Sequence, residues 1–129
     1  MNTEDQVVEA IARRDAASLG ALIDSPEGRE VLEREPSLLA VAVRAGCRDC
    51  IHVFLRSGVD ANTLESDGTT ALYWAVTMGD IEAVRILVHS GADPRVVCAN
   101  GDDAISQARK WDRQEILSLL LGHLGDRTL

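Results

Sequence analysis

Cys47 and Cys50, a Cys-x-x-Cys pair, are the residues best suited to chemistry in this 129-residue chain. Two thiols at this spacing can form a disulfide or supply half of a zinc site, and a thiol at a helix N-terminus becomes more reactive. A redox motif of this kind, however, is expected beside a strand–helix–strand unit, and a structural zinc needs four ligands. A thiol redox or metal-binding protein that uses Cys47 and Cys50 is therefore the alternative hypothesis.

Other catalytic chemistry lacks support in the sequence. The repeat described below places no Ser, Cys or carboxylate beside His52, His89 or His123 in a pocket, so a nucleophile–base pair is not predicted. The chain has no glycine loop of the phosphate-binding or dinucleotide-binding type. We therefore expect no enzyme, no cofactor and no metal site.

Composition restricts the fold and the partner. Hydrophobic residues make up 46% of the chain and aromatic residues only 3%, which favours packed helices over a β-sandwich. The net charge is −8, and residues 1–33 carry a net charge of −5. Such a field disfavours nucleic acid and anionic membranes as partners, and it suits a protein with a basic patch. Three cysteines and an acidic N-terminus predict a reducing, cytoplasmic location without a secretory signal.

An internal repeat of 33 residues organises the chain. Residues 34–66 align with residues 67–99, and the latter align with the segment that begins at Asn100. Within the unit 67–99, Asp67-Gly68 indicates a turn, and Thr70 and Asp80 can each cap a helix. Gly79 suits a sharp turn with positive φ between the two helices. One such unit cannot bury its own apolar stripe, so neighbouring units must stack.

The unit resembles the ankyrin repeat, whose Thr-Pro-Leu-His-x-Ala signature corresponds here to Thr70-Ala71-Leu72-Tyr73-Trp74-Ala75. The Gly91-Ala92-Asp93 ending also matches the family, whereas the unit 34–66 lacks the proline and the histidine of the signature. The resemblance implies an all-α, ankyrin-type solenoid of about four stacked helix–turn–helix repeats with atypical end caps. Its single domain would comprise an N-terminal cap (1–33), two repeats (34–66 and 67–99) and a C-terminal cap (100–129).

The repeat pattern predicts eight helices, near residues 4–13, 16–24, 38–45, 48–56, 71–78, 81–89, 104–111 and 114–122. Ser25-Pro26 indicates the start of a short extra helix, which Val31 and Leu32 would dock. Leu72 and Leu87 are expected in the core, and Trp74 is expected to pack between neighbouring units.

The resemblance implies a concave binding face formed by the ends of the first helices and by the hairpin tips. The period aligns Ala45, Met78 and Trp111, and the Trp and Met are an expected apolar anchor. Trp111 could equally fold over the C-terminal cap. The predicted partner-binding residues are Arg44, Glu65, Ser66, Asp67, Thr77, Met78, Asn100, Asp102, Lys110 and Trp111.

These observations predict a non-catalytic protein–protein interaction module, monomeric when free, that binds a protein partner on its concave face. Its small size and acidic charge also suit an inhibitor or immunity-type protein that blocks a basic toxin or enzyme.

Overall fold

The computed structural model describes the backbone of residues 2–128 and the side chains of residues 2–125. This part of the chain contains nine helices and no strand. The helices are α1 (Thr3–Ala12), α2 (Ala16–Asp24), α3 (Pro26–Arg34), α4 (Leu38–Ala45), α5 (Arg48–Arg56), α6 (Ala71–Met78), α7 (Ile81–His89), α8 (Ala104–Lys110) and α9 (Gln114–Thr128).

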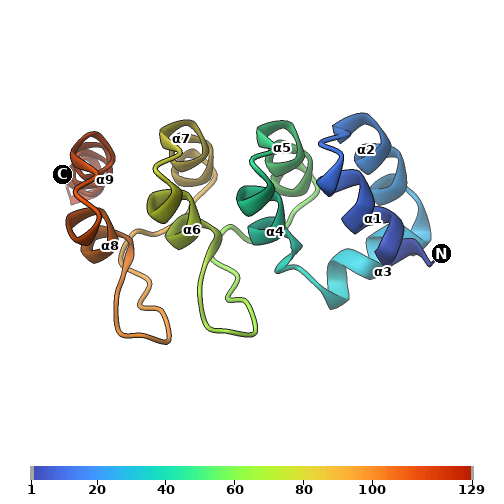
Figure 1. Cartoon of the computed structure of the whole chain (residues 1–129), viewed down its shortest axis with the longest axis horizontal. Coiled ribbons are helices and arrows are strands. Elements are labelled where there is room, and N and C mark those ends of the chain that lie inside the picture. Colours follow the sequence, from blue (N-terminus) through green and yellow to red (C-terminus); the bar gives the residue numbers. More distant parts are fainter. Residues whose placement is uncertain (1, 129) are drawn as a thin grey trace.

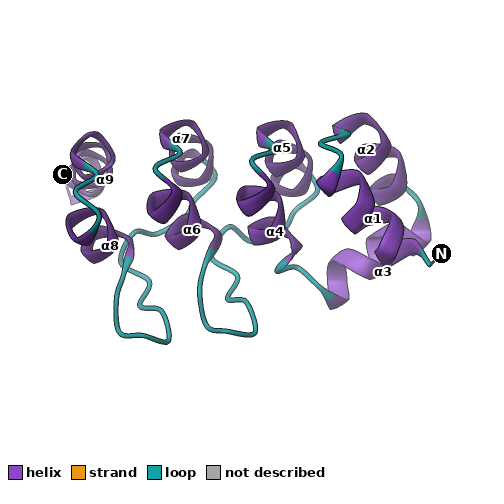
Figure 2. Ribbon diagram, viewed as in Figure 1, coloured by secondary structure: helices purple, strands orange, loops and turns teal. Residues whose placement is uncertain are grey.

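Four antiparallel helix pairs stand in a row, with the chain termini at opposite ends (Figure 1). The first helices α1, α4, α6 and α8 pack side by side as one layer, and the second helices α2, α5, α7 and α9 form the other. Two long loops, residues 57–70 and 90–103, project from the row below the first helices as hairpin-shaped turns (Figure 2). The stack of helix pairs with projecting hairpins is the solenoid that the repeat predicted.

The predicted helix bounds agree closely with the structure. Five helices have the expected bounds, α1 is shifted by one residue at each end, and α8 ends one residue early. The predicted end at residue 122 was too early, because α9 continues to Thr128. Gly122 and Gly125 do not stop this helix, since neither takes the left-handed conformation with which glycine ends a helix.

Each turn between paired helices has a residue in the left-handed conformation at the same position. Gly46 and Gly79 have φ of 73° and 74°, and the corresponding positions in the end pairs are Arg14 (φ 57°) and Asp112 (φ 54°). The expected positive φ at Gly79 is thus confirmed. Left-handed backbone costs a residue with a Cβ about 1–2 kcal/mol, so the two end turns are strained where the two central turns are not.

The second helices begin at equivalent capping residues. The side chains of Asp15, Cys47 and Asp80 each accept a hydrogen bond from the backbone N–H three residues further on. Thr70 caps α6 in the same way, as predicted. Arg113, which precedes α9, instead donates through its guanidinium to the carbonyl oxygen of Thr77 in the neighbouring pair (2.9 Å).

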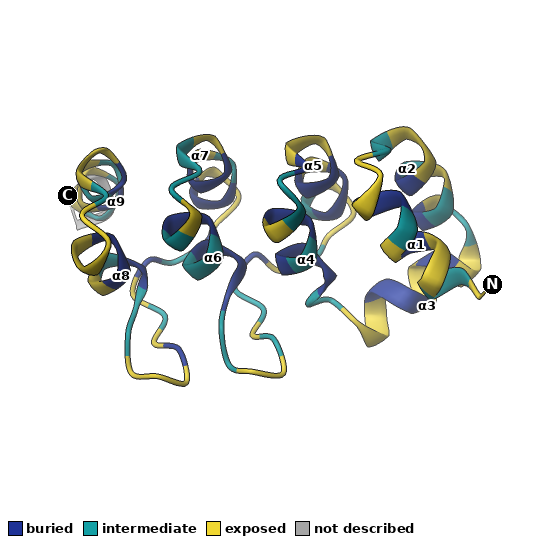
Figure 3. Cartoon of the chain, viewed as in Figure 1, coloured by how far each residue is buried: buried dark blue, intermediate teal, exposed yellow. Residues whose placement is uncertain are grey.

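The core runs through the whole stack between the two helix layers (Figure 3). Leu72 and Leu87 are buried, as predicted, together with Leu39, Phe54 and Leu120. A core with few aromatic rings relies on close contact between small side chains. Buried alanines accordingly occupy equivalent positions on α4, α6 and α8, namely Ala42, Ala75 and Ala108. These alanines allow the first helices of neighbouring pairs to lie close together.

Helix α3 is the short extra helix that Ser25-Pro26 indicated. Its Val31 and Leu32 are buried, and it packs against α1 and α2. Gly28 allows this close approach, because a Cβ at that position would overlap the backbone of Leu22 and Ile23. In Figure 1, α3 lies on the side of the stack from which the two hairpins project.

The substitution Leu72→Ala should destabilise the chain by about 2–5 kcal/mol, because it removes a buried side chain that the surrounding helices cannot fully replace. The free energy of unfolding, measured by urea denaturation, tests this value. The exposed Leu64→Ala is the matched control and should change the free energy of unfolding by less than about 0.5 kcal/mol. An unchanged midpoint for Leu72→Ala would contradict the assigned core.

Candidate binding face

The predicted binding residues lie on one layer of the stack and its hairpins, which together are called the inner face here. Arg44, Thr77, Met78 and Lys110 lie in the last turns of α4, α6 and α8, and Trp111 directly follows α8. Glu65, Ser66, Asp67, Asn100 and Asp102 lie in the two projecting hairpins. The structure divides these residues between two polar clusters and an exposed apolar pair.

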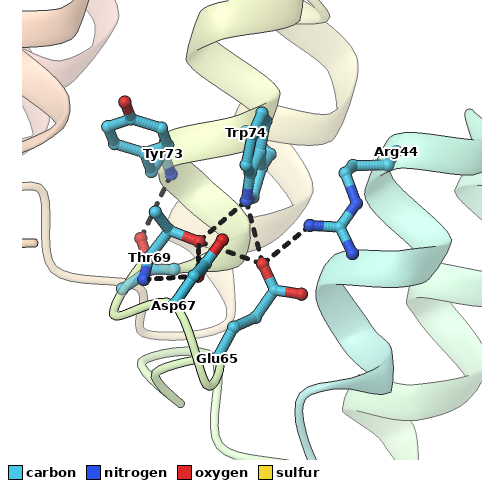
Figure 4. Close-up of polar contacts among 7 residues, drawn as sticks. Arg44, Glu65, Asp67, Thr69, Tyr73 and Trp74 are labelled. Carbon is cyan, nitrogen blue, oxygen red and sulfur yellow. Dashed lines mark hydrogen bonds and ion pairs between the residues drawn. The ribbon is translucent and has the colours of Figure 1, made fainter. Parts of the chain in front are cut away.

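The first cluster surrounds the indole of Trp74 (Figure 4). The Trp74 Nε1–H donates to Glu65 Oε2 (2.9 Å) and Thr69 Oγ1 (2.8 Å). Arg44 reaches over from α4, with its Nη1 2.8 Å from Glu65 Oε2 and its Cζ 5.2 Å from the centre of the Trp74 ring. The Glu65 side chain is only 9% exposed. Arg44 and Glu65 therefore tie the first hairpin to two neighbouring helix pairs.

Asp67 occupies the outer edge of this cluster. The Thr69 hydroxyl oxygen lies 2.6 Å from Asp67 Oδ1, and the Thr69 backbone N–H donates to the same atom (3.0 Å). These two hydrogen bonds, first the hydroxyl and then the amide, hold the pKa of Asp67 below the usual range of an aspartate. Asp67 is exposed, so it presents a negative charge to solvent at the hairpin tip.

The second cluster, around the buried Gln107, is the equivalent of the first one repeat later. Gln107 occupies the position of Trp74 and is 1% exposed. Its amide satisfies its neighbours in the orientation that donates from Nε2 to Asp102 Oδ2 (3.1 Å). Its Oε1 then accepts from Trp111 Nε1 (3.1 Å) and from Thr77 Oγ1 (3.0 Å). Three predicted site residues therefore meet at one amide that sequence reasoning missed.

One edge of the Trp111 ring is fixed by a hydrogen bond, and the rest of the side chain is open to solvent. Its N–H is bound by Gln107, and the Lys110 Nζ lies 6.0 Å from the ring centre, yet the residue is 48% exposed. Met78 ends α6, which packs against α8, and it is 44% exposed. These two are the large apolar side chains among the predicted binding residues, and both are exposed.

The remaining predicted residues have varied surroundings. Asn100 donates from Nδ2 to the hydroxyl oxygen of Tyr73 (3.1 Å), which links the second hairpin to α6. Ser66 is exposed at the tip of the first hairpin. A backbone hydrogen bond from the Ala99 N–H to the Gly68 carbonyl (3.0 Å) holds the two hairpins together. The inner face is consequently a continuous, braced surface.

The cysteines lie outside this face. Cys47 and Cys50 are buried with their sulfur atoms in bonding contact. Cys98, in the second hairpin, is buried, and burial raises the pKa of its thiol. Among the side chains that the structure describes, no group of three or more His, Cys, Asp or Glu residues could hold a metal ion. Over the same residues, no helix is both long and apolar enough to cross a membrane.

A row of helix pairs joined by projecting hairpins defines a helical solenoid, a class of repeat protein in which each unit contacts only its neighbours. The family model of ankyrin repeats in three copies matches residues 9–98 and again residues 38–128. The chain belongs to the ankyrin-repeat family.

Similar stretches occur in proteins of different kinds. Protein PhlB of Serratia liquefaciens is 32% identical over 124 residues, which cover 95% of this chain and 55% of that protein. Potassium channel AKT2/3 of Arabidopsis thaliana is 26% identical over 123 residues, and Palmitoyltransferase Hip14 of Drosophila melanogaster is 34% identical over 98 residues. These matches cover 93% and 74% of this chain, but only 15% of each of those two proteins. What they share with this chain is the repeat rather than one activity.

The substitution Thr69→Val should raise the pKa of Asp67, because it removes the hydroxyl that contributes most to lowering it. The stabilisation that Asp67 provides is complete above the pKa it has when unfolded, and it is lost as the pH falls through the lower folded value. Nuclear magnetic resonance titration of the Asp67 carboxyl measures the change. Asp15, whose pKa the Ser18 hydroxyl lowers, is the internal control and should not move. An unshifted Asp67 would refute this assignment.

Proposed function

We propose that this chain is a non-catalytic module that binds a protein partner on its inner face. Trp111 carries the proposal, because its exposed ring is already oriented by a hydrogen bond to a buried amide. An aromatic side chain that is fixed before binding loses little conformational entropy in a complex, and such residues dominate interface energies. Met78 supplies a second, adaptable apolar contact on the neighbouring helix.

Charge indicates the kind of partner. Asp67 and Asp102 lie in the two hairpins of the inner face, and the whole chain carries a net charge of −8. Glu65 adds little negative charge to the hairpin surface, since Arg44 neutralises it. A protein with a basic patch around an apolar recess therefore suits the inner face.

A more specific form of the proposal is an inhibitor or immunity-type protein that covers the working surface of a basic toxin or enzyme. A small, rigid, acidic surface suits this task, because electrostatic attraction speeds the association of oppositely charged proteins. Adding the purified chain to the captured partner tests this form, since an inhibitor must abolish the partner's activity at equimolar concentration.

The substitution Trp111→Ala should weaken partner binding by about 2 kcal/mol or more while the fold remains intact. Parallel affinity capture with the wild-type and Trp111→Ala chains identifies the partner, and calorimetry then measures its affinity. Trp111→Phe is the matched variant, because it keeps a ring but loses the N–H that Gln107 binds. If Trp111 only packs over the cap, Trp111→Ala should instead lower the melting temperature and leave the affinity unchanged.

Reversal of the hairpin charges by Asp67→Lys and Asp102→Lys should mainly slow association, with a larger effect at low salt than at 0.5 M salt. Stopped-flow association rates at several ionic strengths measure this change. Asp24→Lys, on α2 and away from the inner face, is the control for net charge alone. Equal slowing by the control would show that the hairpins have no special role.

A further inference from the structure

We propose that Cys47 and Cys50 form a dithiol–disulfide couple that exchanges with small-molecule disulfides at the turn between α4 and α5. The two Cα atoms are 5.2 Å apart, within the range that a disulfide spans, and the sulfur atoms are in bonding contact. The couple lies outside the inner face, so it is independent of the proposed binding function.

The backbone around Cys47 is built to hold a negative charge. Cys47 has φ −95° and ψ 91°, close to the values of Asp15 (−97°, 81°) and Asp80 (−86°, 87°). All three residues cap the second helix of their pair, and in two of the three pairs the cap is a carboxylate. The Cys47 sulfur accepts the Cys50 N–H at 3.2 Å, so a thiolate there would occupy the place of those carboxylates.

Two arginines add positive charge beside this position. A surface depression of about 490 Å³ is lined by Cys47 with Arg14, Gly46, Arg48 and Asp49. The Arg14 guanidinium lies against Gly46, with its terminal nitrogen 3.5 Å from where a Cβ on that glycine would be.

Nearby carboxylates pair with part of this positive charge. Arg48 is 3.4 Å from Asp80 Oδ1, and Asp15 is engaged by Ser18. Asp49 is the carboxylate that lines the depression, and the positive charge beside Cys47 therefore comes mainly from Arg14, which lies against Gly46. Cys47 is 4% exposed and lines the depression, whereas Cys50 is fully buried and does not line it, so Cys47 is the thiol from which exchange would begin.

The exchange needs a disulfide as oxidant, for which oxidised glutathione is the probe. The Cys47 thiolate attacks one glutathione sulfur, a mixed disulfide forms, and one glutathione thiolate leaves. The Cys50 thiolate then attacks the Cys47 sulfur and expels the second glutathione thiolate. The two protons of the protein thiols end on the two glutathione molecules, which take up the two electrons that the protein loses.

Equilibration of the full chain with glutathione buffers of different redox ratio tests the couple. After an acid quench and alkylation in denaturant, mass spectrometry counts the free thiols. We expect Cys47 and Cys50 to oxidise together in one two-electron transition, while Cys98 stays a thiol. The variant Cys98→Ala should show the same transition. Glutathione that stays attached to Cys47 without closure by Cys50, or no oxidation of the pair at any ratio, would overturn the proposal.

Alkylation rates in the folded chain test the environment of Cys47. The variant Cys50→Ala places at this position the residue that the next repeat has at Ala83. In this variant, iodoacetamide at pH 7 should modify Cys47 about tenfold faster than Cys98, which is equally buried and whose thiol pKa burial raises. Arg14→Gln and Arg48→Gln should each slow this reaction, and Arg109→Gln on α8 should not. Equal rates for Cys47 and Cys98 would show two packing residues instead of a reactive pair. Circular dichroism checks that each variant is folded. The variant Cys47→Asp gives a second test of the cap position. It should fold, because its carboxylate would cap α5 as Asp15 and Asp80 cap their helices.

Discussion

The apolar residues of each helix pair can be buried only by the pairs on either side, and this constraint shapes the molecule. Leu39, Leu72 and Leu87 lose contact with water only because successive pairs stack in register. Register depends in turn on identical turns, and the left-handed residue between paired helices recurs in every pair. Where this residue is glycine, the left-handed conformation causes no strain. At Gly79 the missing Cβ also leaves room for the guanidinium of Arg113, with which a Cβ would collide.

Stacking also decides what happens to polar residues near the inner face. Turn residues alone would not fix the position of the hairpins against the helices. Each hairpin is held in place by a helix side chain at the same repeat position. Trp74 holds Glu65 and Thr69 in one unit, whereas Gln107 holds Asp102 in the next. The indole of Trp74 and the amide of Gln107 can play the same role, because each directs an N–H donor from its helix toward an acceptor in a hairpin.

Much of the fold could be predicted from the sequence because it depends on local, periodic signals. The spacing of Leu72, Ala75 and Val76, with Thr70 before them and Gly79 after them, defined α6 to the residue. The positions of Arg14 and Asp112 could not be identified as left-handed from their residue types, since neither is a glycine. Their conformation follows from stacking, which imposes the geometry of the central turns on the end pairs. The continuation of α9 to Thr128 likewise depends on glycines that remain helical.

The site was predictable in position and less so in its contacts. A repeat of 33 residues was enough to align Met78 with Trp111 and to place Asp67 at a hairpin tip. It could not show that Glu65 is neutralised by Arg44, or that Gln107 joins Thr77, Asp102 and Trp111, because a period aligns equivalent positions without giving the contacts between side chains. The signal that could have found Gln107 was its position, a polar residue at a helix register that elsewhere holds Val41 and Trp74.

Helix α3 makes the molecule directional. It links the first two helix pairs on the side where the later connections project as hairpins, so the hairpins are confined to the C-terminal part of the stack (Figure 1). The surface formed by both hairpins is therefore limited to the part of the stack that α6 and α8 occupy (Figure 1). Most of the negative charge, by contrast, lies in residues 1–33. The two ends of the chain therefore differ both in net charge and in the loops that they carry.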